Sequence, residues 1–211
     1  MAAGPTCERR FAALLAGPTG SGKTPLGDLL QTRGLKGRRC FHFDFGAELR
    51  RIAEEPARHG GPADEDVEVV RGSLRSGALL EDRHFHIAET ILRAFLDRNG
   101  LTAPDLVVLN GLPRHVGQAA AIDESVSVEL VVWLRCGPEV VHERILRNSG
   151  GDRTGRTDDT RAEVAAKLRV FEERTRPLLD YYRAGNVRVV DIDVGVGSGV
   201  EDMLASLEQA L

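Results

Sequence analysis

The sequence predicts one domain of the α/β class, in which a parallel sheet lies between two layers of helices. Short apolar runs of strand length alternate with longer stretches whose apolar residues recur at helical spacing. Apolar strands that are separated by helices form parallel sheets with both faces covered. The chain has 211 residues, enough for one substantial core but few for two independent domains and a linker.

Five apolar runs are predicted to be the buried strands of this sheet. The segments between them repeat apolar residues three and four positions apart, as helices that pack on a sheet do. The last such segment, 200–211, follows a glycine-rich loop and is predicted to be a helix that only packs. The five predicted strands are residues 11–16, 39–43, 106–109, 130–134 and 187–192.

Two segments interrupt the alternation of strands and helices. Residues 46–82 contain a cluster of glycine, proline and acidic residues that breaks a predicted helix pair. Residues 148–159 are polar, rich in glycine and bear arginines. Binding residues gather on loops that a rigid scaffold carries, so we expect both segments to be flaps over a site within a single domain, 1–211.

Composition and charge exclude several classes of protein. Hydrophobic residues make up 42% of the chain and charged residues 28%, as in an ordinary globular protein. The net charge of -4 and the scattered basic residues argue against nucleic-acid binding. Three cysteines without a CxxC pair support neither a disulfide framework nor a zinc ribbon. The charged N-terminus, and the lack of any apolar run near ~20 residues, predict a cytoplasmic protein without membrane contact, which we expect to be a monomer.

The most informative motif is GPTGSGKT at residues 17–24, which matches the pattern GxxxxGK[ST]. It directly follows the first predicted strand and directly precedes the first predicted helix, as the pattern requires. In such a turn, backbone N–H groups and the positive end of the helix dipole face a phosphate. The motif therefore predicts a P-loop NTPase fold that binds a nucleotide with Mg²⁺ as cofactor. The predicted ATP-binding residues are Gly17, Gly20, Ser21, Gly22, Lys23 and Thr24.

Two side chains of this motif have chemical roles. Lys23 is expected to reach the β- and γ-phosphates as a catalytic residue, and the Thr24 hydroxyl to bind Mg²⁺. The motif alone does not distinguish a kinase from a GTPase, a motor ATPase or a prenyl transferase that acts on tRNA, since all of these hold phosphates in the same loop. The residues that face the acceptor must decide between them.

The segment that follows the strand at 106–109 resembles the adenylate kinase family. Residues 110–114 read NGLPR where that family has Asp-Gly-Phe-Pro-Arg, and Gln118 follows four positions later, as in the family. Further similar segments occur in the family's order, so the resemblance covers nearly the whole chain. They are FGAELR at 45–50, GALLED at 77–82, Glu143-Arg144, GRTDD at 155–159, and the stretch from Thr175 to Tyr182 with Gly185.

The resemblance implies a helical flap at 46–82 that binds a nucleoside monophosphate, and a short lid at 148–159 without zinc. It also implies that arginines neutralise the phosphates, a task for which planar guanidinium groups are suited. Gln118 stands where the family reads the adenine edge, which favours AMP as the acceptor. The implied catalytic residues are Lys23, Arg114, Arg144 and Arg156. The implied acceptor-binding residues are Phe45, Arg50, Leu80, Gly111, Arg114, Gln118 and Lys167, the last in place of a family arginine.

The family pattern is broken at Asn110, at Phe45 with Ala47 and at Pro25, and Asp44 lies next to the second of these. Asn110 replaces the aspartate that helps to hold the water shell of Mg²⁺, which removes one negative charge beside the metal. Asp44 ends the second predicted strand; it either supplies that charge through water, or acts as a general base on an acceptor hydroxyl, or caps the next helix. Phe45 either stacks on the acceptor base or packs in the core.

The sequence therefore predicts a nucleoside monophosphate kinase that transfers the γ-phosphoryl group of ATP to AMP or a related monophosphate. Its partners are expected to be these nucleotides and no nucleic acid. One alternative is a small P-loop kinase that phosphorylates a hydroxyl of a nucleoside or another metabolite with Asp44 as the base. Another is a nucleotide-binding protein whose catalysis is weakened by Asn110.

Overall fold

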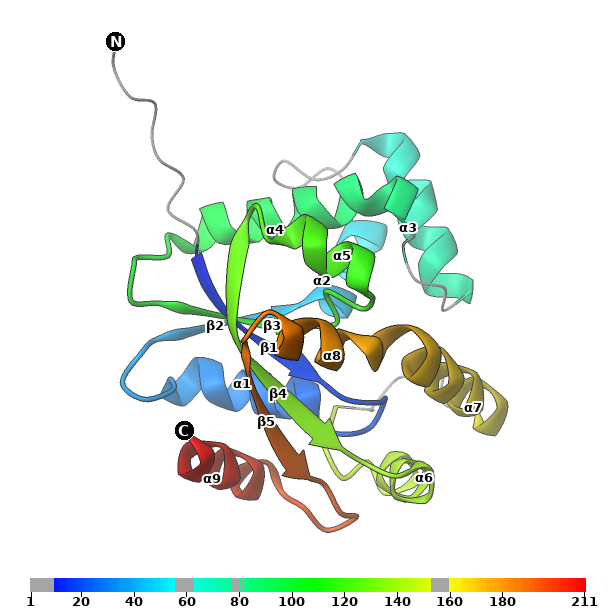
Figure 1. Cartoon of the computed structure of the whole chain (residues 1–211). Helices are drawn as coiled ribbons and strands as arrows, with labels where there is room; N and C mark the ends of the chain where they lie inside the picture. Colours follow the sequence, from blue (N-terminus) through cyan, green and yellow to red (C-terminus); the bar gives the residue numbers. More distant parts are fainter. Residues whose placement is uncertain (1–9, 56–62, 77–79, 81, 153–159) are drawn as a thin grey trace.

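The computed structural model describes residues 10–55, 63–76, 80, 82–152 and 160–211. Within these residues five strands form one parallel sheet in the order β2-β3-β1-β4-β5 (Figure 1). The five-stranded parallel sheet that the sequence predicts is thus confirmed. The strands are β1 (Arg10–Ala16), β2 (Cys40–Asp44), β3 (Leu106–Asn110), β4 (Val126–Arg135) and β5 (Arg188–Asp193).

One strand is longer than its apolar run. The sequence predicts β4 only from residue 130, whereas the strand begins at Val126. Its first part alternates buried valines with the partly exposed Ser127 and the exposed Glu129, so only one side of the strand is buried there. A search for continuous apolar runs therefore finds only the later, fully buried part.

Helices cover both faces of the sheet and give the three layers that the sequence predicts. On one face lie α1 (Lys23–Arg33) and α9 (Val200–Ala210), and on the other α4 (Phe85–Asn99), α5 (Val116–Ile122) and α8 (Pro177–Ala184) (Figure 1). The central strand β1 sends Ala12 and Leu14 into the core on one face and Ala13 and Leu15 into the core on the other. Because successive side chains of a strand point to opposite faces, this one strand contributes to both apolar layers.

The remaining helices follow the carboxyl ends of the strands. The predicted flap segment 46–82 contains a helix pair, α2 (Phe45–Glu54) and α3 (Asp64–Ser76), and a short 3₁₀ turn, Asp82–His84. After β4 come α6 (Pro138–Leu146) and α7 (Arg161–Val170), which continues through a π-helical turn, Phe171–Thr175, into α8. Of the predicted lid 148–159, residues 153–159 lie outside the described residues.

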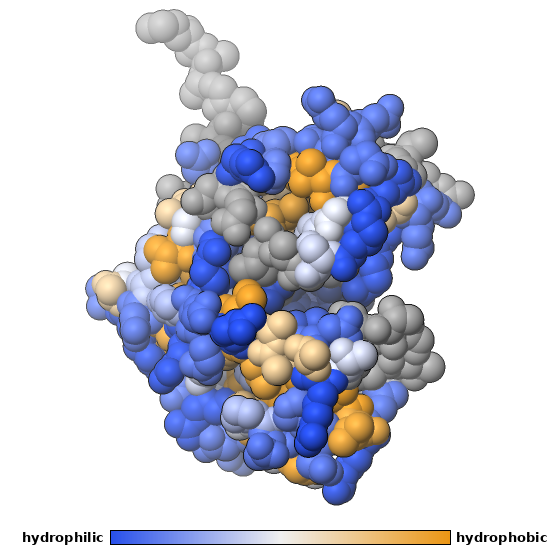
Figure 2. All heavy atoms as spheres, turned by 90° about the vertical axis from the view of Figure 1, so that its right-hand side faces the viewer, coloured by the Kyte–Doolittle hydropathy of each residue, from blue (hydrophilic) through white to orange (hydrophobic). Residues whose placement is uncertain are grey.

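The surface seen from the side of α3 and α7 is mostly hydrophilic and is hollowed between an upper and a lower part (Figure 2). None of the helices in the described ranges combines the length and the apolar character that a bilayer crossing requires.

Candidate active site

The P-loop connects β1 to α1 through glycines that no other residue replaces easily. Gly17, Gly20 and Gly22 have φ values of +155°, +74° and +99°, where side chains with a Cβ are strained. A Cβ on Gly17 would also lie 2.9 Å from the carbonyl oxygen of Leu134. The turn can therefore form only with glycine at these positions. The chain then enters α1 at Lys23.

Lys23 folds back over the loop. Its Nζ donates hydrogen bonds to the carbonyl oxygens of Gly17 at 2.8 Å and Pro18 at 2.7 Å. The ammonium group thus lies within the turn to which the sequence assigns the phosphates. Ser21 in the same turn is fully buried, and its Oγ has no hydrogen-bond partner in the part of the chain that the structure describes. A buried polar atom without a partner fits a site that takes a polar ligand.

Thr24, Asp44 and Asn110 form a triangle of hydrogen bonds beside the loop. Thr24 Oγ1 donates to Asp44 Oδ2 at 2.8 Å, and Asn110 Nδ2 donates to Thr24 Oγ1 and to Asp44 Oδ2, each at 3.0 Å. The triangle forms because Asp44 and Asn110 are register partners at the carboxyl ends of β2 and β3. The sheet thereby brings together the three residues that the sequence assigns to the metal.

The two oxygens of Asp44 have different partners. Oδ1 accepts from the backbone N–H of Ala47 at 2.9 Å and caps α2, whereas Oδ2 faces Thr24 and Asn110. Two of the alternatives for Asp44 are therefore compatible: it caps the helix and also gives the site a carboxylate. Hydroxyl and carboxylate oxygens are hard donors of the kind that Mg²⁺ takes directly or through water, so Thr24 and Asp44 fit the metal, whereas Asn110 faces them with its amide nitrogen.

Arg114 follows β3 and is fixed through its backbone. Its N–H donates to Gln118 Oε1 at 2.8 Å, and its carbonyl oxygen accepts from Thr175 Oγ1 at 2.9 Å. Burial lowers the pKa of the Arg114 guanidinium below its ordinary value. No carboxylate of the described residues forms an ion pair with it, so a bound anion is the partner that this guanidinium fits.

Gln118 lies beneath Arg114 and is 2% exposed. Its Oε1 accepts from Arg114 N, and its Nε2 donates to the carbonyl oxygen of Leu80 at 2.9 Å, so it ties the flap to the end of β3. A side-chain amide has two hydrogens and two oxygen lone pairs, and each atom of Gln118 uses one of them here. Counted over the described residues alone, one donor and one acceptor position of Gln118 therefore remain.

Arg144 on α6 is 2% exposed and binds backbone carbonyls. Its Nε donates to Gly20 O at 3.0 Å, and its Nη1 donates to Gly195 O at 2.8 Å and Ser198 O at 2.9 Å. Burial lowers the pKa of Arg144 as well. Its Nη2 has no hydrogen-bond partner among the described residues and lies beside the P-loop at Gly22. Arg144 thus joins the P-loop to the turn before α9 and retains one free donor there.

The replacement Arg144→Ala is expected to lower the free energy of unfolding by about 3 kcal/mol, because it leaves several buried carbonyl oxygens without a donor. Urea denaturation of the variant measures this loss. The matched control is Arg147→Ala at the C-cap of the same helix, whose exposed guanidinium pairs with Glu143 and should contribute less than about 0.5 kcal/mol. Equal losses in the two variants would contradict the role of Arg144.

The other predicted acceptor residues lie as follows. Arg50 is exposed on α2. Its guanidinium lies over Gly46, since a Cβ added to that glycine would be 3.5 Å from Arg50 Nη1. Phe45 is 5% exposed and packs against Phe43, with ring centroids 6.0 Å apart, which is the arrangement that the core-packing interpretation requires. Lys167 lies half-buried on α7. The described ranges do not include Arg156. Gly111, with φ +84°, turns the chain out of β3.

Three residues of this region were not predicted from the sequence: His42, Asp28 and Gly27. His42 on β2 has a side chain only 4% exposed, with Nδ1 2.8 Å from Asp28 Oδ1 and Nε2 3.4 Å from Asn110 Nδ2. Gly27 on α1 admits the ring, because a Cβ there would lie 2.3 Å from His42 Nε2. The available signals were a polar residue between two phenylalanines in a strand and a glycine inside a helix.

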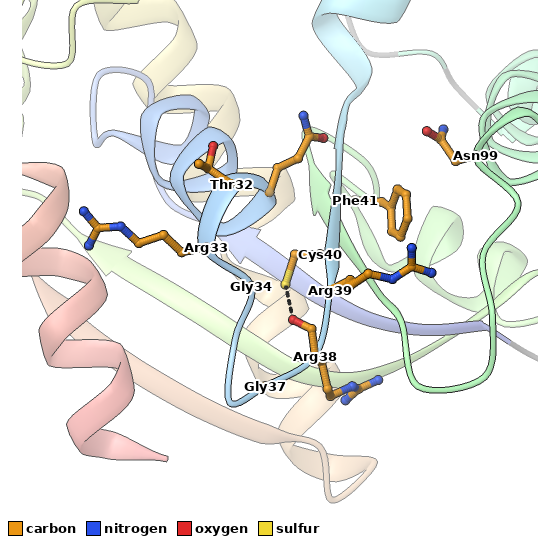
Figure 3. Close-up of a pocket in the computed structure, with 10 residues that line it drawn as sticks. Thr32, Arg33, Gly34, Gly37, Arg38, Arg39, Cys40, Phe41 and Asn99 are labelled. Atoms are coloured by element: carbon orange, nitrogen blue, oxygen red, sulfur yellow. Dashed lines mark hydrogen bonds between the residues drawn. The ribbon is translucent and has the colours of Figure 1, made fainter.

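A separate hollow of about 550 Å³ lies near the amino end of β2 and is lined by the end of α1, the following turn and Asn99. Figure 3 shows that its arginines point in different directions. Arg33 pairs with Glu201, and Arg39 pairs with Asp105. Its charges do not converge, and it lies away from the strand ends that carry the P-loop, so it is not the candidate active site.

A P-loop with a hydroxyl and a carboxylate beside it, and with a buried arginine bound to its backbone, defines a nucleotide-binding protein of the P-loop class. No protein-family model matches the chain. It is 33% identical over 206 residues to an adenylate kinase of Synechococcus sp., covering 94% of this chain and 97% of that protein. It is 30% identical over 189 residues to an adenylate kinase of Parvibaculum lavamentivorans, covering 84% and 82%. It is 32% identical over 192 residues to one of Stenotrophomonas maltophilia, covering 87% and 90%. The chain belongs to the adenylate kinase family and is an ATP-dependent phosphotransferase.

Proposed function

We propose that the protein transfers the γ-phosphoryl group of ATP to AMP. The observation that carries this proposal is Arg114, a half-buried arginine that has no carboxylate partner in the described part of the chain and whose backbone N–H and carbonyl are both hydrogen-bonded. It follows β3, the neighbour of the strand that leads into the P-loop. A fixed positive charge at that place suits the phosphate of an acceptor.

On the donor side, Lys23 leaves the carbonyls of Gly17 and Pro18 and binds the β- and γ-phosphates. Thr24 would bind Mg²⁺ and Asp44 would hold it through water, with Asp44 supplying the negative charge that Asn110 lacks. When bound, the metal neutralises charge on the phosphate oxygens. Arg144 keeps the P-loop in place and directs Nη2 towards it. Phosphoryl transfer needs little covalent work from the protein, so positioning and charge neutralisation account for most of the catalysis.

On the acceptor side, Arg50 and Arg114 bind the phosphate of AMP, with Lys167 and Arg156 completing the charge around the transferred group. The donor and acceptor positions that remain on Gln118 bind the adenine edge, which offers both an acceptor nitrogen and an amino group. The attacking oxygen of AMP is anionic, so no general base is required. Closure of the segments 46–82 and 148–159, both within one domain, excludes water that would hydrolyse ATP.

The second candidate, a kinase that uses Asp44 as a base on a hydroxyl, is supported only by the position of that carboxylate. Its Oδ2 already accepts from Thr24 and Asn110, and its Oδ1 from Ala47. An oxygen bound by protein donors is poorly available to take a proton from a substrate. We therefore favour the monophosphate acceptor.

A substrate panel tests the choice. Purified protein is incubated with ATP and Mg²⁺ and, in separate reactions, with isotopically labelled AMP, GMP, CMP, UMP and the corresponding nucleosides, and products are separated by chromatography. We expect labelled ADP from AMP, with a kcat/KM at least about tenfold above that of the other monophosphates. Phosphorylation of a nucleoside hydroxyl without diphosphate formation would favour the second candidate. Tight ATP binding without any product would point to weakened catalysis.

A further inference from the structure

One buried polar side chain has no part in the proposed mechanism, although it adjoins the metal-binding residues. His42 lies on β2 with its ring between Asp28 of α1 and Asn110 of β3, at 2.8 Å and 3.4 Å from their polar atoms. Its side chain is 4% exposed. The amide of Asn110 that it contacts is the one that also donates to Thr24 and Asp44.

The partners of His42 assign its tautomer. The carboxylate oxygen of Asp28 accepts, so the facing Nδ1 carries the hydrogen and donates it. Asn110 Nδ2 is a donor, so the facing Nε2 presents its lone pair. Nδ2 has two hydrogens, of which one is directed to His42 and the other to Asp44 and Thr24. Each polar atom in the chain from Asp28 to Asp44 then has a complementary neighbour.

The imidazole and the Asp44 carboxylate together fix the orientation of the Asn110 amide. An asparagine amide occupies nearly the same volume in two orientations. If it turned, Oδ1 would face both the Asp44 carboxylate and the lone pair of His42, and three acceptors would meet. The lone pair of His42 thus disfavours the turned amide and keeps Nδ2 on Asp44.

Gly27 gives independent support, because it makes room for the ring at a cost to the helix. Its Cβ would lie 2.3 Å from His42 Nε2, so any other residue would displace the imidazole. Glycine inside a helix destabilises it by roughly 1 kcal/mol relative to alanine. The imidazole ring therefore fits only because α1 has a glycine at this position, and that glycine makes the helix less stable.

We propose that His42 is a positioning residue for the Mg²⁺–nucleotide site. By accepting from Asn110, it holds the amide that keeps Asp44 Oδ2 beside Thr24 Oγ1, and Asp28 in turn holds the ring in the required tautomer. The inference rests on the proposed function only in taking Mg²⁺·ATP as the bound nucleotide. It does not depend on the acceptor.

The first test is spectroscopic. In protein labelled with ¹⁵N-histidine, long-range ¹H–¹⁵N correlations at about pH 8, where imidazoles are mostly neutral, report which ring nitrogen carries the hydrogen. The signal of His42 is assigned by its loss in a His42→Gln variant. We expect hydrogen on Nδ1. Hydrogen on Nε2 would overturn the proposal, because Nε2 would then be a donor facing a donor.

The second test compares two variants by calorimetric titration with a non-hydrolysable ATP analogue, with and without Mg²⁺. Glutamine places an amide oxygen about as far from the backbone as Nε2, whereas asparagine reaches only as far as Nδ1. Outer-shell partners of metal sites typically change affinity about 10–100-fold. We therefore expect His42→Asn to weaken Mg²⁺-dependent binding about tenfold, His42→Gln to stay within about twofold, and neither to change binding of the metal-free analogue.

A matched control is His86→Asn, which alters another histidine–carboxylate pair, His86 with Asp66, away from the P-loop. It should leave both affinities unchanged. Gly27→Ala, which displaces the ring while His42 remains, should behave as His42→Asn does and serves if that variant fails to fold. If glutamine and asparagine weaken binding equally, or binding with and without metal falls in parallel, His42 is a packing residue. Because no acceptor is present, a failure of the AMP assay leaves this test intact.

Discussion

The replacement Lys23→Ala is expected to lower the turnover number of phosphoryl transfer by roughly 10³-fold, since loss of one preorganised donor to developing charge costs about that much. The ammonium group of Lys23 is hydrogen-bonded to the P-loop itself, with Nζ 2.8 Å and 2.7 Å from two carbonyl oxygens of the turn. Those carbonyls are uncharged and can release it to phosphate oxygens, which are stronger partners. The measurement is kcat and KM for ATP at saturating acceptor in a coupled assay.

The control for Lys23→Ala is Lys36→Asn, which removes the same charge from an exposed turn at φ +48°, where asparagine is tolerated. It should leave kcat within about twofold and exclude a general effect of net charge. A Lys23→Ala variant that raises KM while kcat is unchanged would contradict the assignment. Lys23 would then bind ground state and transition state equally.

The P-loop is predictable from the sequence because its chemistry is contiguous. The glycines, Lys23 and Thr24 lie within eight positions, and strongly patterned segments flank them. Each glycine is required locally, as the positive φ values of Gly20 and Gly22 show. Short-range rules therefore suffice for the donor half of the site and for the three-layer fold.

The metal side of the site is less predictable, because it depends on strand order. Asp44 and Asn110 are 66 positions apart and meet only because β3 lies between β1 and β2 in the sheet. The contact of His42 with Gly27 likewise requires α1 to pack against β2. No local pattern encodes either neighbour relation.

Arg144 illustrates a different limit. Its position in the family pattern assigns it to phosphate, but its carbonyl partners at Gly195 and Ser198 lie about 50 positions further along the chain. Backbone carbonyls leave no signature in a sequence, since every residue has one. The structural duty of this arginine therefore becomes visible only in the fold.

Exchange of the two register partners Asp44 and Asn110 isolates the charge beside the metal. The single replacement Asp44→Asn is expected to lower kcat/KM at limiting Mg²⁺ by roughly 10²-fold, comparable to the loss of one electrostatic contact in an active site. Asparagine caps helices about as well as aspartate, so the bond from Ala47 N and the start of α2 survive this change. The loss thus reports the missing charge and not a damaged helix.

The double variant Asp44→Asn with Asn110→Asp returns one carboxylate to the triangle from the neighbouring strand. Because the two positions are register partners and both contact Thr24 Oγ1, the charge moves by only about one strand spacing, ~4.8 Å. We expect it to recover most of the lost kcat/KM and of the Mg²⁺ activation constant, which gives a large coupling in a double-mutant cycle. Additive losses in the two single variants and the double variant would mean that Asp44 acts through its position rather than its charge.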